Sequence, residues 1–467
     1  MTIDGIPVIS PQTLPVINPA TGQEMARAPD CTYEHVDAAV LAARRAFPAW
    51  RALSTAERSA MLRTAAIILS EHVEALAVLL TSEQGKPLAD ARSEILGAAF
   101  WLKSFAKLEL PIHVDEDHAG RRWETRHIPV GVVGAISPWN FPVLLSFFKI
   151  APALAAGNTV VMKPSPYTPL TMLRIGALLG DVLPPGVLNM ICGGDQAGPW
   201  LTAHPDIDKV SFTGSTPTGK LVLQSAASNL KRVTLELGGN DAAIVLPDVN
   251  VAAVAKDLFW AAFRNSGQIC VAAKRIYVHA DIYDELAAEL QVCAAAVVIG
   301  EGTDTNAVLG PVQNRMQYKR VLDLIHDCRQ NGMRFLTGGE PEPGPGYFIS
   351  PTIVDNPPED SRVVREEAFG PLLPLLKYTD IDDAIARAND SEFGLAASIW
   401  SGDVEAAVAL APRLEVGTVW INEIQLLSPF HAFAGHKQSG FGVENGLHGM
   451  LEYTLPQTIT KPGKVER

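Results

Sequence analysis

The feature that most constrains the fold is a regular alternation of short apolar segments with longer amphipathic ones between about residues 130 and 238. TVVM (159–162) has the composition of a buried strand, and LTMLRIGALLGDVL (170–183) after it has helical spacing. Because parallel strands need a crossover connection, such alternation favours a parallel, doubly wound sheet. The pattern continues as LNMIC (strand), GPWLTAH (helix), KVSFTG (strand), TGKLVLQSAA (helix) and RVTLEL (strand).

A second alternating region follows Gly238 and Gly239 and continues to about residue 440. AAIVL and KRIYVH are predicted strands, and each is followed by a predicted helix. Near the N-terminus, Ser54 and Glu57 have the spacing of a capping box before a helical run. The stretch MLEYTLPQTITKP near the C-terminus is a predicted strand that needs a partner. We therefore expect an α/β protein with two sheets and an additional strand element.

Bulk properties exclude several classes of function. The net charge of −13 disfavours nucleic acid or an anionic membrane as the main partner. The five cysteines are scattered, odd in number and never form a CxxC pair, which argues against a disulfide framework. No His, Cys and Asp cluster has ligand spacing, so no metal is expected. No leader sequence and no run of 18 apolar residues is visible, so we expect a cytoplasmic protein without a membrane span.

Three polar residues stand out as candidates for chemistry, and the residues alone leave each open. Cys270 follows a Gly-Gln pair and is either a nucleophile or a small buried hydrophobe. Glu236 ends the strand RVTLEL and is either a general base with a raised pKa or a structural ion-pair partner. Asn140, in ISPWNFP, is either an oxyanion donor or an ordinary turn residue.

A weak phosphate-binding signal lies in SFTGSTPTGK (211–220). The chain has no GxGxxG fingerprint, but Gly214, Ser215 and Gly219 open a predicted helix directly after a strand. Glycines allow close backbone approach, and a helix N-terminus attracts anions. An ordinary strand–helix turn explains the same residues.

Together these segments resemble the aldehyde dehydrogenase superfamily, in its order and over essentially the whole chain. Each motif is weak alone, whereas seven in this order are a specific signal. They are PWNFP (138–142), KPS (163–165), FTGS (212–215), LELGG (235–239), GQIC (267–270), EEAFGP (366–371) and HKQSG (436–440).

The resemblance implies oxidation of an aldehyde to a carboxylic acid. Cys270 matches the nucleophile that forms a thiohemiacetal and, after hydride loss, a thioester. Asn140 matches the side-chain oxyanion donor, which acts with the backbone N–H of Cys270. Glu236 matches the base that activates water, and Glu444 matches a second acid that relays protons in some members.

The resemblance also implies NAD or NADP as cofactor. Lys163 matches the lysine that holds the adenosine ribose, and Gly214 with Ser215 matches the pyrophosphate turn. Glu367 matches the residue that binds the nicotinamide ribose. Pro166 departs from many NAD-preferring relatives, which carry a glutamate there that would repel a 2′-phosphate, so NADP use stays open. The remaining cofactor-lining positions are Ile136, Trp139 and Phe369.

The family's organisation implies three parts for this chain. A cofactor domain would comprise residues 1–110 and 130–238, and a catalytic domain residues 239–438. An oligomerisation element would pair residues 111–129 with the strand at 453–463, giving that strand its partner across a subunit boundary. We therefore expect a homodimer or homotetramer.

Arg264 is the candidate for substrate choice. FRNSGQICV resembles the succinic semialdehyde dehydrogenase branch, in which an arginine at this position helps to bind the substrate carboxylate. That branch carries a second arginine where this chain has Phe148, and Phe148 with Leu145 suggests an apolar mouth instead. A structural ion pair at the helix end is the other interpretation of Arg264.

Two other enzymatic functions compete with this one. A CoA-acylating semialdehyde dehydrogenase usually lacks the base at the LELGG position, whereas Glu236 is present here. A cysteine-dependent hydrolase needs a histidine partner for its thiol, and none of the eleven histidines has a recognisable catalytic setting. The sequence does not name the aldehyde.

Overall fold

The computed structural model describes residues 1–118 and 120–463. Within these residues the first sheet has eight strands in the order β2-β1-β9-β8-β7-β10-β11-β21. The central strands run parallel, as the sequence alternation predicts, and the edge strands are antiparallel. The parallel strands are β9 (Leu188–Met190), β8 (Thr159–Lys163), β7 (Val132–Ile136), β10 (Lys209–Thr213) and β11 (Arg232–Glu236), and the edges are β1 (Thr2–Ile3), β2 (Ile6–Pro7) and β21 (Gly440–Phe441).

Helices cover both faces of this sheet because apolar residues alternate between the two faces of its central strands. Along β7, Val133 and Ala135 pack into one core, whereas Val132 and Ile136 pack into the core on the opposite face. The first face is covered by α2 (Thr55–Glu71), α3 (Val73–Gln84), α4 (Leu88–Phe105), α5 (Leu144–Ala155) and α6 (Leu170–Leu179). The second is covered by α1 (Tyr33–Ala52), α7 (Ala197–Ala203) and α8 (Thr216–Ala226).

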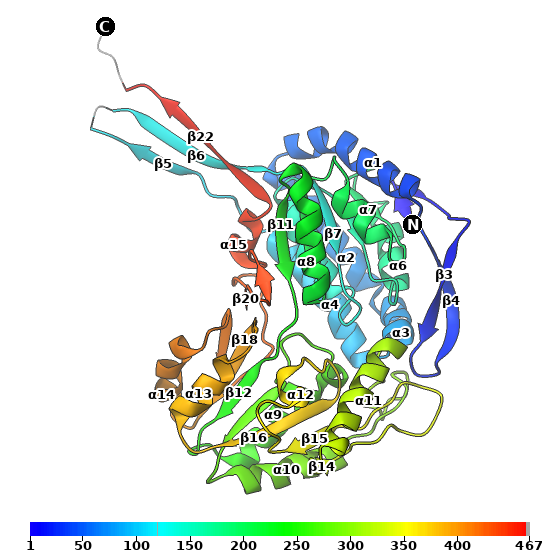
Figure 1. Cartoon of the computed structure of the whole chain (residues 1–467). Coiled ribbons are helices and arrows are strands. Elements are labelled where there is room, and N and C mark those ends of the chain that lie inside the picture. Colours follow the sequence, from blue (N-terminus) through cyan, green and yellow to red (C-terminus); the bar gives the residue numbers. More distant parts are fainter. Residues whose placement is uncertain (119, 464–467) are drawn as a thin grey trace.

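The second sheet has seven strands in the described part of the chain, in the order β14-β15-β16-β13-β12-β18-β19. They are β14 (Phe335–Thr337), β15 (Thr352–Asp355), β16 (Leu372–Tyr378), β13 (Arg275–His279), β12 (Ala242–Val245), β18 (Ala396–Trp400) and β19 (Thr418–Ile421). The helices α9 (Val251–Phe263) and α10 (Tyr283–Ala295) pack on one face. The other face carries α11 (Arg315–Gln330), α12 (Arg362–Arg365), α13 (Ile381–Asn389) and α14 (Val404–Leu410). The predicted α/β fold is confirmed, and Figure 1 shows the two layered halves one above the other.

Local sequence signals explain several boundaries. The Ser54–Glu57 capping box begins α2, with the Ser54 N–H donating to the Glu57 carboxylate at 2.7 Å. Gly85, at φ +97°, ends α3. Smaller elements complete the fold: the pair β3 (Thr13–Asn18) and β4 (Gln23–Pro29), the pair β17 (Phe393–Gly394) and β20 (His436–Lys437), and the short helix α15 (Gly446–Leu451).

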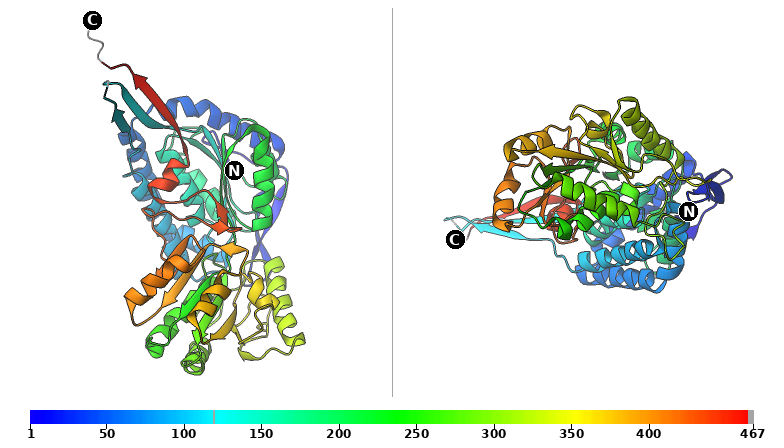
Figure 2. Two further views of the ribbon diagram at one scale, coloured as in Figure 1. Left: turned by 60° about the vertical axis from the view of Figure 1, so that its left-hand side comes forward. Right: turned by 90° about the horizontal axis from the view of Figure 1, so that it is seen from below.

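A narrow arm protrudes from the first half of the molecule, as Figures 1 and 2 show from three directions. It consists of β5 (His113–Glu116), β6 (Arg122–Pro129) and the tail strand β22 (Thr454–Lys461). The tail strand pairs with β6 of its own chain, from Thr454 opposite Pro129 to Lys461 opposite Arg122. The expectation that its partner lies across a subunit boundary is therefore wrong. β6 leads directly into the sheet strand β7, and the junction between them lies beside the end of α15, from which β22 continues. The two strands therefore meet within one chain.

No single helix among the described residues is long and apolar enough to cross a membrane. Only α2 and α3 taken as a pair reach that length and composition, and the chain bends by 70° between them. Both helices bury their apolar residues in the core that covers the first sheet.

Candidate active site

Four of the predicted site residues lie together because they occupy the carboxyl ends of neighbouring parallel strands. Ile136 ends β7 opposite Lys163 at the end of β8, and Glu236 ends β11 opposite Thr213. Gly214 follows β10 directly. Ligands of open α/β sheets bind at this edge, so the fold places the predicted cofactor residues where a dinucleotide would be held.

The segment that carries Cys270 is rigidly held between α9 and β13. Asn265 and Ser266 both have left-handed backbone conformations, with φ of 51° and 55°. Gly267 also has positive φ, and a Cβ there would lie 2.1 Å from the carbonyl oxygen of Gly370. Strained backbone of this kind persists where the surroundings fix it, as is common near functional groups. The sequence therefore needs glycine at position 267 to bring the half-buried Cys270 into place.

Asn140 lies against the same segment, from the loop after β7. Its side-chain amide donates to the carbonyl of Gln268 at 2.9 Å. Its own backbone carbonyl accepts from the Lys86 ammonium at 3.0 Å and from the Asn265 amide at 3.2 Å. Lys86 in turn forms a fully buried ion pair with Glu94 at 2.5 Å. The second N–H of the Asn140 amide remains available as a donor near Cys270.

Glu236 is 3% exposed, and neither oxygen of its carboxyl group has a hydrogen-bond partner among the described residues. Burial raises the pKa of Glu236 well above its usual range, the Glu444 carboxylate raises it further, and the Lys149 ammonium opposes both effects. An unpartnered buried carboxyl group is costly, so its retention points to a role other than stability. The paired, structural interpretation of Glu236 is not supported by these contacts.

Glu444 belongs to a buried polar network behind Glu236. Its Oε1 accepts from the Lys149 ammonium at 2.5 Å, and both side chains are at most 1% exposed. Lys149 also donates to the Thr213 hydroxyl at 2.6 Å. Ser211 donates to Glu444 at 3.5 Å and accepts from the Tyr453 hydroxyl at 3.0 Å. Glu444 therefore influences Glu236 through charge while its own charge is balanced by Lys149.

The surroundings of Cys270 oppose ionisation of its thiol. Burial raises the pKa of Cys270 to about 12, with Asp241, Glu367 and Glu236 adding to that rise. The Lys274 ammonium acts in the opposite direction. Full reactivity of this thiol therefore requires help from the site.

Lys163 fits a role in holding a polyhydroxyl ligand. It is buried at the end of β8, and burial lowers the pKa of its ammonium. Its hydrogen bond to a described residue goes to the carbonyl of Pro164 at 3.2 Å. An ammonium has three N–H donors, so donors remain for ribose hydroxyls.

The predicted pyrophosphate turn, around Gly214 and Ser215, is more tightly packed than the spacing of its glycines indicates. The Gly214 N–H donates to the Glu236 carbonyl at 3.0 Å, and a Cβ on Gly214 would lie 2.4 Å from the Phe212 ring. Ser215 caps α8, accepting from the Thr218 N–H at 3.4 Å. A Cβ on Gly219 would meet Leu237 at 2.5 Å, so both glycines are needed for close packing of the helix on the sheet.

Trp139 packs against Phe369, from a distant segment of the chain that also carries Glu367. The Trp139 and Phe369 rings pack edge to face with centroids 5.3 Å apart. Phe369 has a positive φ of 48°. Glu367 accepts from the Gly239 N–H at 3.2 Å and pairs with Lys274 at 3.3 Å.

The predicted substrate residues fall in two different environments. Arg264 is exposed, has no ion-pair partner among the described residues, and lines a cavity of about 160 Å³. The structural ion pair that its position also suggested is therefore not found. Phe148 is 1% exposed and stacks on Trp101, and Leu145 is also buried, so neither forms an open mouth. They are buried because α5, apart from Ser146 and Lys149, is apolar and lies within the first core. The cavity is instead lined by Phe141 and Leu144, together with Lys86, Asp90, Ser93, Glu94 and Asn265.

Sequence reasoning missed the lysines that surround the catalytic candidates. Lys149 is a lone charge in the apolar run LLSFFKIAPALA, and Lys274 is a buried charge after CVAA. A charged residue at a core position is rarely buried without a partner, and that rule could have marked both. No group of three or more His, Cys, Asp or Glu in the described residues is arranged to hold a metal ion.

Comparison with known proteins identifies the family. The model of the aldehyde dehydrogenase family matches residues 8–459. Aldehyde dehydrogenase LUC3 of a Fusarium species is 41% identical over 446 residues, which cover 95% of this chain and 94% of that protein. The NAD+ complex of an aldehyde dehydrogenase from Bacillus cereus has a TM-score of 0.96 at 36% identity, covering 99% of this chain and 96% of that one. An E. coli NADP dependent enzyme has a TM-score of 0.95 at 37% identity, covering 99% and 97%.

A parallel sheet with the predicted cofactor residues at its carboxyl edge is compatible with a dinucleotide-dependent oxidoreductase. The chain belongs to the aldehyde dehydrogenase family. It is thus an oxidoreductase that oxidises aldehydes, and enzymes of this family use NAD or NADP. The predicted class, fold and type of cofactor are confirmed.

Proposed function

We propose that this enzyme converts an aldehyde to the free carboxylic acid through covalent intermediates on Cys270. The observation that carries the proposal is the meeting of three groups. The Asn140 amide lies on the Cys270 segment, and Glu236, whose carboxyl oxygens have no hydrogen-bond partner among the described residues, is near enough to Cys270 to act on its charge. These are the donor, the nucleophile and the base that acyl transfer to water requires.

The reaction divides into two halves. The Cys270 thiolate attacks the aldehyde carbon, and the resulting oxyanion is bound by the Asn140 amide and the Cys270 N–H. As the C=O double bond re-forms from the oxyanion, the former aldehyde hydrogen would leave as hydride to a bound NAD or NADP, and a thioester would remain on Cys270. Glu236 then takes a proton from water, the water oxygen attacks the thioester, and the thiolate leaves with the acid as product.

The cofactor in this proposal is NAD or NADP, which when bound supplies the hydride acceptor. The residues fit such a group: Lys163 has unused donors, and α8 presents its N-terminus after Gly214 and Ser215. We assign Glu367 to the nicotinamide ribose, and Ile136, Trp139 and Phe369 to the walls of the same site. Because Pro166 carries no negative charge, we propose that a 2′-phosphate is tolerated.

We propose that aldehydes with a distal carboxylate are among the substrates. Support comes from Arg264, an exposed guanidinium with no ion-pair partner in the described part of the chain, beside a cavity that also contacts Phe141 and Leu144. An arginine can bind a carboxylate with two parallel hydrogen bonds. Arg264→Ala should raise KM for an ω-carboxyl aldehyde about tenfold or more, a loss on the scale of one charged hydrogen bond. An equal change in KM for a neutral aldehyde of the same length would contradict this assignment.

Two rival functions make different products. If the thioester is transferred to CoA, turnover requires CoA and yields an acyl-CoA, but the buried Glu236 supports transfer to water. A hydrolase turns over esters without any nicotinamide cofactor. The test is product analysis with NAD or NADP and without CoA. Stoichiometric carboxylic acid and reduced cofactor are expected, whereas a strict need for CoA or a lack of redox product would overturn the proposal. Cys270→Ala should abolish this turnover.

We also propose a division into a cofactor domain (1–110 and 130–238), a catalytic domain (239–438) and an oligomerisation element (111–129 and 453–463). The protruding arm of β5, β6 and β22 supports self-association, because its edge strands are exposed. A homodimer or homotetramer is proposed, and light scattering of the intact protein tests it. All five cysteines are free, which supports the proposed cytoplasmic location.

A further inference from the structure

Lys274 is a buried charge that contacts both halves of the proposed reaction centre. It is 6% exposed and lies four residues after Cys270, just before β13. Its ammonium donates to the carbonyl of Ile269 at 2.8 Å and to the carbonyl of Cys270 at 2.5 Å. It also pairs with Glu367 at 3.3 Å. Two N–H donors of the ammonium are thus directed at the nucleophile segment, and the charge is ion-paired with the acid assigned to the ribose.

The contact with Ile269 has a direct chemical consequence. The Ile269 carbonyl belongs to the same peptide group as the Cys270 N–H, which is the proposed backbone donor to the oxyanion. A cation bonded to the carbonyl oxygen withdraws electron density through the planar amide and polarises its N–H. The Cys270 N–H is therefore a stronger donor with Lys274 in place than without it.

The charge of Lys274 also offsets the acids around the thiol. Asp241, Glu367 and Glu236 each disfavour the Cys270 thiolate, and Lys274 opposes them. Burial raises the pKa of Asp241 to about 7, so this acid is partly neutral near neutral pH. Glu367 is in contact with Lys274 and balances part of its charge.

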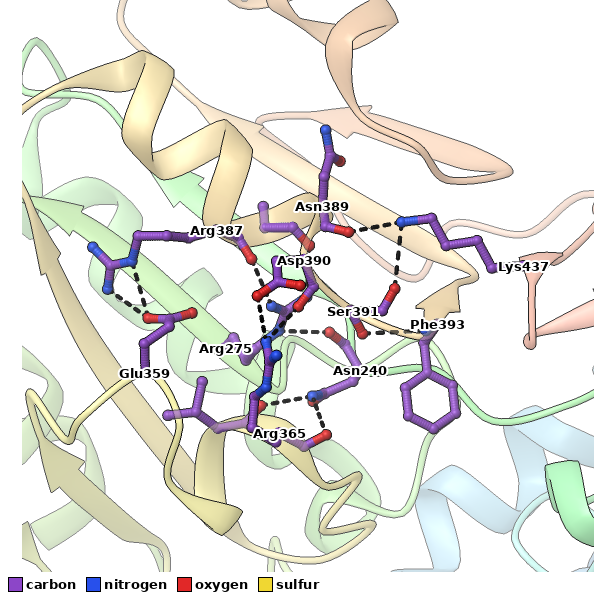
Figure 3. A network of polar contacts seen from close by, with 12 residues as sticks. Asn240, Arg275, Glu359, Arg365, Arg387, Asn389, Asp390, Ser391, Phe393 and Lys437 are labelled. Carbon is purple, nitrogen blue, oxygen red and sulfur yellow. Dashed lines mark hydrogen bonds and ion pairs between the residues drawn. The ribbon is translucent and has the colours of Figure 1, made fainter.

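The backbone around Lys274 is fixed by the residue that follows it. The Arg275 guanidinium donates to the carbonyls of Asn240 at 2.9 Å and Ala388 at 2.9 Å. The N–H groups of Lys274 and Arg275 both donate to the Asp241 carbonyl. Figure 3 shows Arg275 beside Asn240, with the ion pair of Arg387 and Glu359 next to it. Lys274 is therefore held in register with the Cys270 segment and cannot drift from it.

We propose that Lys274 is a positioning residue that stabilises the Cys270 thiolate and strengthens the Cys270 N–H as an oxyanion donor, with Glu367 as the group that moderates its charge. This rests on the proposed role of Cys270 as nucleophile. Removing the Lys274 charge makes the Cys270 thiolate less stable and the Cys270 N–H a weaker donor. Removing the Glu367 charge makes the thiolate more stable.

Alkylation of cofactor-free enzyme by iodoacetamide tests the proposal, with mass spectrometry to follow modification of Cys270 among the five cysteines. Below the thiol pKa, the rate is proportional to the thiolate fraction, so one pKa unit changes it about tenfold at any fixed pH. Lys274→Met should slow Cys270 alkylation about tenfold or more, and Lys274→Arg should restore most of the rate. Glu367→Gln should accelerate alkylation severalfold. Lys256→Met, a change of a lysine outside the site on α9, serves as the matched control and should leave the rate unchanged.

Opposite shifts in Lys274→Met and Glu367→Gln are the signature of charge, since a merely structural defect would change both in the same direction. An unchanged rate in folded Lys274→Met, or slower alkylation in Glu367→Gln, would overturn the proposal. If Lys274→Met does not fold, Lys274→Gln replaces it with the same expected slowing, because Glu367→Gln alone does not report on the lysine. Failure of the proposed function is separately visible, because Cys270→Ala would then retain dehydrogenase turnover.

Discussion

The pH dependence of thioester hydrolysis should move in opposite directions when Glu444 and Lys149 are neutralised. Glu236 has a raised pKa and is active as a base only when deprotonated, so hydrolysis should increase as pH rises through that pKa. Glu444→Gln removes a charge that raises the pKa of Glu236 while Lys149 continues to lower it, so the pKa of Glu236 falls. Lys149→Met removes the opposing charge and leaves Glu444 unbalanced, so it raises the pKa of Glu236 further.

The size of these shifts follows from the burial of the pair. Lys149 and Glu444 are at most 1% exposed, so solvent screens them little. At an effective dielectric constant of about 20, unit charges about 8 Å apart interact by about 2 kcal/mol, which corresponds to about 1.5 pKa units. We therefore expect the acidic limb of the profile to shift by about one to two units to lower pH in Glu444→Gln and to higher pH in Lys149→Met.

The assay is stopped-flow absorbance of reduced cofactor between pH 5 and 9. When thioester hydrolysis is slower than hydride release, the rate of cofactor reduction after the first turnover equals the rate of hydrolysis. Ser211→Ala serves as the control, because it removes a weak 3.5 Å hydrogen bond to Glu444 without changing charge. Its profile should stay close to that of the wild type. Shifts of the same sign in both charge variants, or no shift in either, would refute the electrostatic coupling of Glu236 to this pair.

Two further predictions concern stability. Lys86→Met leaves Glu94 buried without its partner and should lower the free energy of unfolding by about 3–5 kcal/mol, and the double variant with Glu94→Gln should recover much of it. Urea unfolding measures both, and equal losses in single and double variants would contradict the ion-pair argument. Burial raises the pKa of Glu83 from 4.5 to about 7. Protonated Glu83 therefore contributes its full share to the free energy of unfolding below pH 4.5, and this contribution is lost as the pH rises through 7. Glu83→Gln should therefore reduce the fall in unfolding free energy between these pH values by about 3 kcal/mol, and an unchanged pH dependence would count against it.

The sequence was sufficient for the features that depend on local pattern. Alternating strands and helices predict the doubly wound sheet, and Glu236 lies at the strand end where RVTLEL places it. The Ser54 capping box and the helix before Cys270 could also be predicted, because each depends on residues close together in the sequence.

Features that depend on contacts between distant segments could not be predicted in this way. Lys149 acquires its partner Glu444 from a position 295 residues away, and no periodicity within α5 indicates that contact. Phe148 is apolar in sequence whether it lines a mouth or stacks on Trp101 in the core. Likewise, a strand pattern at the C-terminus does not reveal whether its partner is β6 of the same chain or a second subunit.

The central claim is that Cys270 carries the acyl group and that Glu236 releases it to water. Glu236→Gln, mixed rapidly with cofactor and aldehyde and then quenched in acid for intact-mass measurement, tests both parts at once. We expect about one equivalent of reduced cofactor per active site, followed by a stall with an acyl group bound to Cys270. Steady turnover at the wild-type rate with no acyl adduct on Cys270 would contradict it.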